Sequence, residues 1–359
     1  MRKFLKIAAV PLLILLGYLS FWPVPIEPKA WNAPTNAGYV GDFRANNDMA
    51  SMRLIDLGGY VGPEDLTEGP DGRIYMSTHS GVVAYYDPET DKVGKYVDSN
   101  GRILGLEFGP DGILYGADAY QGLVRFEEDG SETLLTNKTS DGSPIKYANS
   151  LDITSDGIIY FTDATQRFGA KENGGTLPAS ILDLMEHGLT GRVLKFDPST
   201  GETSVVIEGL SFANGVSLTK DEKHLLVAET GNYSVTKFAL DGSGASERIL
   251  RNLPGFPDNL NRDADGSFWL GLASPRSEPV DRLSGSPFLR KVIMRLPEAV
   301  RPKPQRYGFI IWFEEDGEVR QTVQDPSGAY ALTTGALTGA NGRVYVSSLT
   351  EAKLGVLGP

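Results

Sequence analysis

Six short turn motifs in this sequence are each preceded, seven residues earlier, by a residue in an equivalent position. These six positions hold Glu64, Leu104, Asn149, Asn214, Asp258 and Thr334. Four of the six carry carboxylate or amide oxygens, and they stand in otherwise apolar segments. Burying such a cluster without partners for its oxygens would be costly. The first hypothesis is therefore that a ligand supplies the partner.

A hard divalent cation is the partner that these residue types favour. Calcium takes six to eight oxygen ligands in a flexible shell, whereas magnesium prefers a strict octahedron with fewer protein ligands. Zinc and iron favour His or Cys, but the chain has no Cys and none of its three His residues occupies one of the six positions. We therefore predict a calcium ion held by Glu64, Asn149, Asn214 and Asp258.

Two alternatives remain open for these residues. Asn and Asp are good turn formers by themselves, so any one of them could serve the local backbone only. Oxygen-bearing side chains at four of the six equivalent positions favour the metal over this explanation. Asn259, beside Asp258, is either a fifth ligand or a residue that caps the turn.

The turns themselves define the elements that must position these residues. Asp-Gly or Asn-Gly ahead of β-branched and aromatic residues is a strong hairpin signal, because the turn needs a positive φ that Gly adopts freely. The turns begin at Asp71, Asp111, Asp156, Asp221, Asp265 and Asn341, and in the fourth of them Glu222 replaces the Gly. The sequence therefore predicts six hairpins.

The spacing of the hairpins predicts a six-bladed β-propeller, an all-β fold, over residues 51–359. Three of the five intervals between turns are about 40 to 45 residues, the length of one four-stranded blade. Many Gly and Pro residues together with Tyr and Phe also favour short strands. Residues 52–57 would complete the last blade, and equivalent positions would converge on the axis.

Two longer intervals contain insertions that we expect on one face of the propeller, where such loops usually shape a pocket. The first runs from Gln166 to Leu189, and the second from Ser274 to Arg306. The second includes an amphipathic stretch beginning at Pro287. It is either a lid that touches a bilayer and admits lipophilic substrates or a helix packed on the propeller.

The N-terminus predicts a membrane anchor. Basic residues flank an apolar run from Ile7 to Trp22, and the following Pro residues end the helix. We expect an uncleaved transmembrane or signal-anchor helix over residues 1–24, with a cleaved signal peptide as the alternative, and a linker over 25–50. The basic start places the propeller in the periplasm or another extracytoplasmic space. The net charge of -12 argues against a nucleic-acid partner. The oligomeric state is not predicted.

Around the candidate ligands the chain resembles the calcium-dependent propeller superfamily of paraoxonases, gluconolactonases and diisopropylfluorophosphatase. It resembles most the strictosidine synthase-like branch, which includes adipocyte plasma membrane-associated protein. Motifs that carry the resemblance are Gly62-Pro-Glu-Asp, Tyr160-Phe-Thr-Asp, Phe212-Ala-Asn-Gly-Val and Pro254-Gly-Phe-Pro-Asp-Asn. The resemblance covers about Arg53 to the C-terminus. It implies that Glu64, Asn149, Asn214, Asp258 and Asn259 hold a catalytic calcium.

Three departures from that pattern limit what the resemblance implies. Leu104 stands where paraoxonases have a catalytic His, so water activation by a His there is disfavoured. Residues 333–339 contain no acid, whereas strictosidine synthases use a Glu on the last blade, so their condensation reaction is disfavoured. Ser150 replaces an Asp that, with the acid at Asp65, would help to hold a second calcium.

The predicted function is a calcium-dependent hydrolase of esters or lactones, of arylesterase or lactonase type, with phosphotriesters as a further class. A bound calcium polarises a carbonyl or phosphoryl oxygen and stabilises the oxyanion that forms. Asp258 would act as base or nucleophile while Glu64 mainly holds the ion; alternatively both are only ligands. The competing hypothesis is a non-catalytic calcium-binding propeller that recognises a small molecule or a protein.

Overall fold

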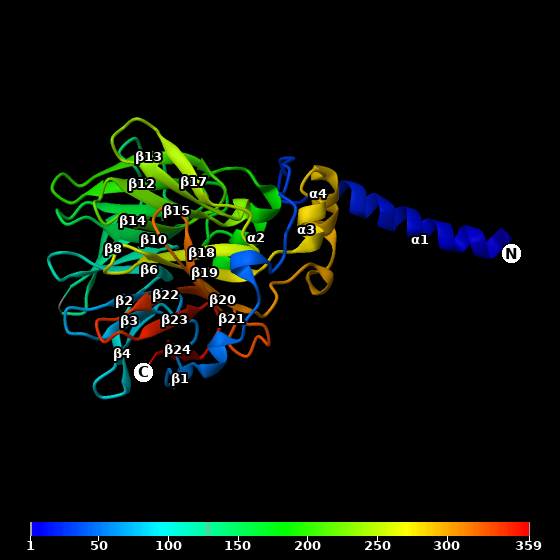
Figure 1. The fold of residues 1–359 in the computed structure, drawn as a ribbon. Helices are drawn as coiled ribbons and strands as arrows, with labels where there is room; N and C mark the ends of the chain where they lie inside the picture. The colour runs from blue at the N-terminus through cyan, green and yellow to red at the C-terminus, as the bar shows by residue number, and fades with distance from the viewer. Residues whose placement is uncertain (1, 128, 359) are drawn as a thin grey trace.

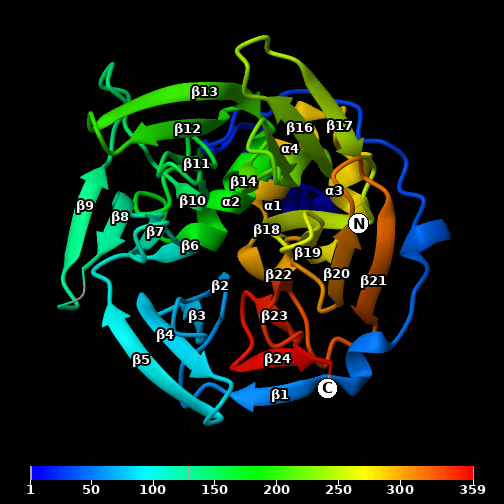
Figure 2. The same cartoon turned by 60° about the vertical axis from the view of Figure 1, so that its left-hand side comes forward.

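Six four-stranded antiparallel sheets form a closed ring in the computed structural model (Figures 1 and 2). The structure describes residues 2–127 and 129–358, with side chains from residue 11 onward. The ring confirms the predicted six-bladed β-propeller. The first five blades are β2 (Leu66–Glu68), β3 (Ile74–Ser77), β4 (Val82–Asp87) and β5 (Lys92–Asp98); β6 (Ile103–Phe108), β7 (Leu114–Asp118), β8 (Gly122–Phe126) and β9 (Glu132–Thr136); β10 (Ala148–Ile153), β11 (Ile159–Asp163), β12 (Gly191–Asp197) and β13 (Glu202–Leu210); β14 (Ala213–Leu218), β15 (His224–Glu229), β16 (Ser234–Ala239) and β17 (Ser246–Leu250); and β18 (Gly255–Arg262), β19 (Phe268–Pro275), β20 (Gly308–Phe313) and β21 (Val319–Asp325).

The sixth blade closes the ring by joining the two ends of the propeller. Its strands are β22 (Thr333–Thr338), β23 (Val344–Ser348) and β24 (Lys353–Leu357), with β1 (Arg53–Asp56) as the outermost strand. β1 pairs antiparallel with β24, with Arg53 opposite Val356. The predicted closing strand is therefore confirmed.

The turn residues explain why the hairpins form. Gly72, Gly112 and Gly157 have positive φ in the turns of the first three blades, where a side chain would be strained. In the fourth blade Glu222 adopts a φ of 56° instead, and its carboxylate accepts a bond of 2.8 Å from the backbone N–H of Ser155. This contact with the neighbouring blade helps to hold the less favourable turn.

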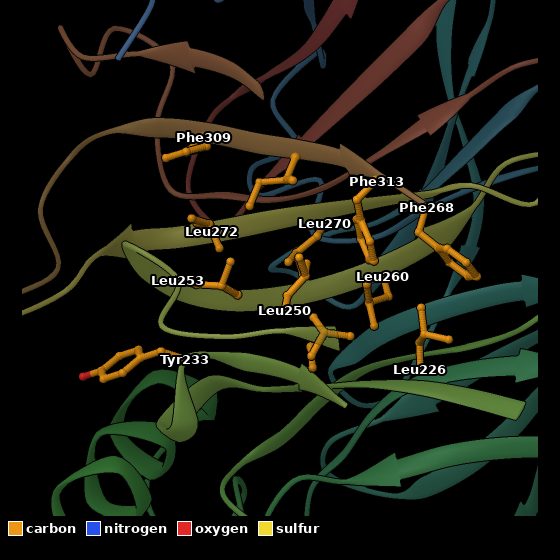
Figure 3. Close-up of a cluster of buried hydrophobic side chains, with 13 residues drawn as sticks. Leu226, Tyr233, Leu250, Leu253, Leu260, Phe268, Leu270, Leu272, Phe309 and Phe313 are labelled. Carbon is orange, nitrogen blue, oxygen red and sulfur yellow. The ribbon is translucent and has the colours of Figure 1, made fainter. Parts of the chain in front are cut away.

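Between neighbouring blades, apolar side chains form continuous packing layers. Figure 3 shows the layer between the fourth and fifth blades, where residues of β15 and β16 meet those of β18, β19 and β20. Its members include Leu226, Leu260, Leu270, Phe268 and Phe313, all buried. Such layers fix each innermost strand relative to its neighbours and so fix the residues that face the axis.

In the described part of the chain, four helices lie outside the sheets: α1 (Arg2–Phe21), α2 (Thr176–Glu186), α3 (Glu278–Arg282) and α4 (Pro287–Arg295). Single 3-10 turns are η1 (Gly41–Phe43), η2 (Asp48–Ser51), η3 (Thr230–Asn232) and η4 (Glu298–Val300). The predicted insertions contain α2, α3 and α4, which gather on the side from which α1 projects (Figure 1). Within the described residues, no helix is both long and apolar enough to span a membrane, so the predicted transmembrane or signal-anchor helix is unsupported.

The segment after α1 is packed against the propeller, although its composition predicted a linker. Ile26 is fully buried, and Trp31 stacks on His187 with ring centroids 4.0 Å apart. The guanidinium of Arg276 donates a bond of 2.6 Å to the carbonyl of Pro34. We call residues 25–36 the strap, because they bind to both insertions.

Candidate metal centre

Four of the five predicted metal ligands line one cavity of about 290 Å³ at the axis: Glu64, Asn149, Asn214 and Asp258. Each comes from a different blade, and each is at most 5% exposed. Asn259, 1% exposed, follows Asp258 on β18 and is buried beside this set rather than among the residues that line the cavity. The structure therefore brings the predicted residues together.

The backbone at these positions departs from regular pairing. In β10, β14 and β18 the register shifts across the residues that include Asn149, Asn214 and Asp258, and the same shift occurs around Thr334 in β22. A β-bulge re-aims a side chain out of the sheet, and bulges are frequent next to active sites. Repeated bulges thus turn these side chains toward the cavity, which the sequence spacing alone did not reveal.

Four oxygens in this cluster have no hydrogen-bond partner among the residues that the structure describes. They are Glu64 Oε2, Asn149 Oδ1, Asn214 Oδ1 and Asn259 Oδ1, and all four are buried. Buried polar atoms in folded proteins are nearly always paired. Unpaired acceptors from four of the five predicted ligands fit an oxygen-coordinated cation such as calcium.

Hydroxyl and amide groups orient the atoms of this cluster. Asn214 Nδ2 donates to Thr230 Oγ1 over 3.1 Å, so its free Oδ1 lies on the other side of the amide. Asn259 Nδ2 donates to the backbone carbonyl of Glu64 over 2.9 Å, and Thr334 Oγ1 donates to the same carbonyl over 2.6 Å. Thr334, at the sixth equivalent position, therefore supports the backbone at Glu64.

Burial disfavours the ionised form of both carboxylates. Burial raises the pKa of Glu64 well above its usual range, and the charge of Asp258 raises it further. Burial likewise raises the pKa of Asp258 to about 7, with a contribution from the charge of Asp65. A bound cation would favour both ionised forms, because an opposite charge lowers the pKa of a carboxyl group.

The candidate set differs from a site built on carboxylate and imidazole ligands. Within the described part of the chain, no group of three or more His, Cys, Asp or Glu side chains is arranged to hold a metal. The cluster here has two carboxylates, and amide oxygens provide the rest. It therefore depends on the Asn residues, which the repeat pattern identified.

Apolar side chains from the insertions form part of the cavity wall. The wall includes Leu177, Ile181 and Met185 of α2 and Ile293 and Met294 of α4. The prediction that the insertions shape the pocket is confirmed. The amphipathic stretch at Pro287 forms α4, in which Arg290 and Met294 are buried. Arg290 donates to the carbonyl of Met185 on α2 over 3.1 Å, and Met294 packs in the same cluster as Leu104 and Phe212 of the propeller.

Arg102 and His79 also line the cavity, although neither was among the predicted ligands or catalytic residues. Arg102 is 6% exposed and lies two positions before Leu104. Its Nη1 donates to the carbonyls of Thr78 and Ile103, over 2.9 and 2.8 Å. His79 also lines the cavity, and burial together with the charge of Arg102 lowers its pKa. In the sequence, only the position of Arg102 two residues before Leu104 could have indicated that Arg102 lines the cavity.

The residues discussed for a second calcium make bonds within the protein. Asp65 accepts bonds from the backbone N–H groups of Leu66 and Leu106, both over 2.9 Å, so it links the first two blades. Ser150 Oγ accepts a bond of 3.2 Å from the N–H of Val216. Both residues therefore have a structural role between blades.

Family models and curated proteins match this six-bladed propeller. A strictosidine synthase family model matches residues 149–243, and a strictosidine synthase-like N-terminal model matches residues 41–84. Adipocyte plasma membrane-associated protein of Salmo salar is 30% identical over 96% of this chain and 86% of its own length. The chain therefore belongs to the strictosidine synthase-like family, together with the adipocyte plasma membrane-associated proteins. Protein STRICTOSIDINE SYNTHASE-LIKE 13 of Arabidopsis thaliana is 35% identical over 67% of this chain and 60% of its own length.

Solved structures with the same fold include enzymes and a calcium-binding protein. A gluconolactonase of Xanthomonas campestris aligns with a TM-score of 0.62 and 18% identity, over 93% of this chain and 96% of that one. Regucalcin of Agrobacterium tumefaciens, described as a calcium-binding protein, aligns with a TM-score of 0.61 and 15% identity, over 86% and 93% of the two chains. At these identities the likeness concerns the fold.

Proposed function

We propose that this protein is a calcium-dependent hydrolase of esters or lactones, of arylesterase or lactonase type. The observation that carries the proposal is the set of buried, unpaired oxygens of Glu64, Asn149 and Asn214 at an apolar-walled cavity. Solved propellers of this fold include a gluconolactonase and a calcium-binding regucalcin, which supports the reaction class and the ion. Phosphotriesters are a further substrate class with the same kind of oxygen.

In this proposal the cavity residues have three different roles. Glu64, Asn149, Asn214, Asp258 and Asn259 hold the calcium, which polarises the substrate oxygen when bound. Asp258 lies on the cavity wall, where its carboxylate can accept a proton from water or attack the reacting carbon. The apolar residues of α2 and α4 exclude water and bind the substrate's apolar part.

Turnover of phenyl acetate and of a panel of lactones, with and without chelator, tests the proposal. We expect hydrolysis that disappears with chelator and returns with calcium. Asp258→Asn should lower turnover by at least about 100-fold, the contribution of a general base, while a good part of the calcium affinity remains. Equal losses of binding and turnover would leave Asp258 as a ligand only.

The competing function is a calcium-binding propeller without catalysis. Calcium binding by calorimetry without turnover of any ester or lactone would favour it. A condensation of the strictosidine synthase type is disfavoured, because the sixth blade has no acid at residues 333–339. The residue at the sixth equivalent position is Thr334, and its hydroxyl donates to the carbonyl of Glu64.

We also propose that the chain associates with a membrane surface through its N-terminal segment. Relatives named plasma membrane-associated proteins support the association. A periplasmic or other extracytoplasmic location of the propeller remains a prediction.

A further inference from the structure

Exposed apolar side chains lie on the same elements that line the cavity. Leu177 is 52% exposed at the start of α2, and Phe288 and Leu289 are 55% and 42% exposed on α4. Val300, 64% exposed, immediately precedes Arg301, which lines the cavity. We call these four residues the collar. Clusters of exposed apolar side chains around a cavity mark interaction surfaces.

The C-terminal end of α1 is attached to the helix that carries half of the collar. Arg295, at the end of α4, donates to the carbonyls of Trp22 and Leu19, over 2.6 and 3.0 Å. The hydroxyl of Tyr18 in turn donates to the carbonyl of Arg295 over 3.0 Å. Figure 1 shows α1 leaving the molecule beside α4. The helix that carries Phe288 and Leu289 is thus attached to the end of α1.

The exposure of α1 indicates what covers the collar. Residues 12–16 are consecutive Leu and Ile residues that are each 51 to 67% exposed. Five consecutive helical residues span more than one turn, so they point in every direction around the axis. A protein groove covers one face of a helix, whereas a lipid phase surrounds it. Exposed Phe21 and Trp22 at the base of α1 fit the interfacial level of a bilayer.

We propose that the collar docks on a lipid surface, so that the cavity opens at the bilayer and takes lipophilic substrates from it. α1 and the collar contact the same membrane, and Arg295 holds the two together. The strap then connects this contact to the cavity wall, because it begins just after α1 and binds to both insertions. The docking depends on shape and exposure alone, so it is independent of the reaction proposed above.

The absence of Cys from the sequence allows a direct test. The full chain with Phe288→Cys is labelled with an environment-sensitive fluorophore and mixed with phosphatidylcholine vesicles that carry lipid-attached quenchers. Leu134→Cys is the matched control, because Leu134 is 46% exposed on β9, away from the collar. We expect a blue shift and quenching several-fold stronger at position 288 than at 134.

Equal quenching at the two positions in vesicle-bound protein would overturn the proposal, as would failure of the full chain to bind vesicles. A blue shift at position 288 that appears without vesicles and grows with protein concentration would show that a second copy covers the collar instead. Because none of these readings uses turnover, inactivity toward esters and lactones would contradict the hydrolase proposal and leave the docking result unaffected.

Discussion

Hydrogen bonds from the amide nitrogens fix the orientation of the Asn214 and Asn259 side chains. In Asn214 the amide nitrogen is engaged by Thr230, and the oxygen remains free. Thr230 in turn donates to the carbonyl of Pro257 over 2.7 Å, directly ahead of Asp258. One buried hydroxyl therefore links two candidate ligands from different blades.

Removing that hydroxyl should weaken calcium binding without removing a ligand. Thr230→Val leaves the amide of Asn214 free to rotate, and we expect about a 10-fold loss of calcium affinity, the usual effect of losing a group that orients a ligand. Isothermal titration calorimetry measures the change. Thr230→Ser keeps the hydroxyl and should restore most of the affinity. Wild-type affinity in the Val variant would show that Thr230 does not orient Asn214.

Among the elements, the strap has the least evident sequence signal. Its contacts use backbone carbonyls such as that of Pro34, which have no side-chain signature, so its Pro, Ala and Asn content reads as a linker. Ile26 and Trp31 are apolar anchors. Ile26 packs in the same cluster as Leu104 and Met294, which line the cavity.

Ile26→Ala should therefore destabilise the propeller even though residue 26 lies outside it. Removing a fully buried aliphatic side chain costs about 3 kcal/mol, because a cavity remains where the methyl groups were. Val40→Ala is the control: Val40 is 56% exposed in the segment after the strap, and its loss should cost less than about 0.5 kcal/mol. Denaturant unfolding measures both, and equal effects would contradict the packing role of the strap.

Helix α2 carries a buried carboxyl group that makes stability depend on pH. Burial raises the pKa of Asp183 to about 7, and the charge of Glu186 also raises it. Asp183 Oδ2 has no partner among the described residues. Because the folded protein holds this proton more tightly than the unfolded chain does, stability due to Asp183 is lost as pH rises from the ordinary carboxyl pKa to about 7.

Asp183→Asn should reduce that pH dependence. Thermal unfolding of the wild type is expected to shift upward when the pH is lowered from about 8 to about 5, and the shift should be smaller in the variant. Other carboxyl groups titrate in this range, so the comparison between the two proteins is the measurement. An identical shift in both would contradict ionisation of Asp183 as a cause.

The elements differ in how well the sequence predicts them. Asp-Gly turns have a local cause, the positive φ at Gly72 and its equivalents, so six hairpins and the number of blades were predictable. The candidate ligands were predictable because they recur at fixed spacing from those turns. The bulges at Asn149 and Asn214 and the place of Arg102 were not, because they depend on packing between blades. For α1, the apolar run predicted the helix, but its membrane-spanning role is unsupported.

At the scale of the whole molecule, the candidate metal centre joins blades that are far apart in sequence. Glu64 precedes the first innermost strand, whereas Asp258 lies on the fifth. A ligand bound only by the folded ring stabilises the ring by mass action. At a calcium concentration 100 times the Kd, the gain is about 2.7 kcal/mol.

Calcium should accordingly raise the Tm of the propeller, and chelator should lower it. Differential scanning calorimetry over a series of calcium concentrations measures the shift. Magnesium at equal concentration is the control and should have a smaller effect, because the amide-rich set does not suit a strict octahedron. A Tm that does not respond to calcium would contradict binding at the axis.

Ring closure by β1 and β24 also has a consequence for biosynthesis. The carbonyl of Glu64 is bound by Asn259 from the fifth blade and by Thr334 from the sixth. During translation, β1 and Glu64 can take their places in the ring only after β24, which ends at Leu357, has been made. The candidate metal centre would then assemble only after β24 has formed, so a nascent chain without β24, or one truncated before it, should lack the proposed activity.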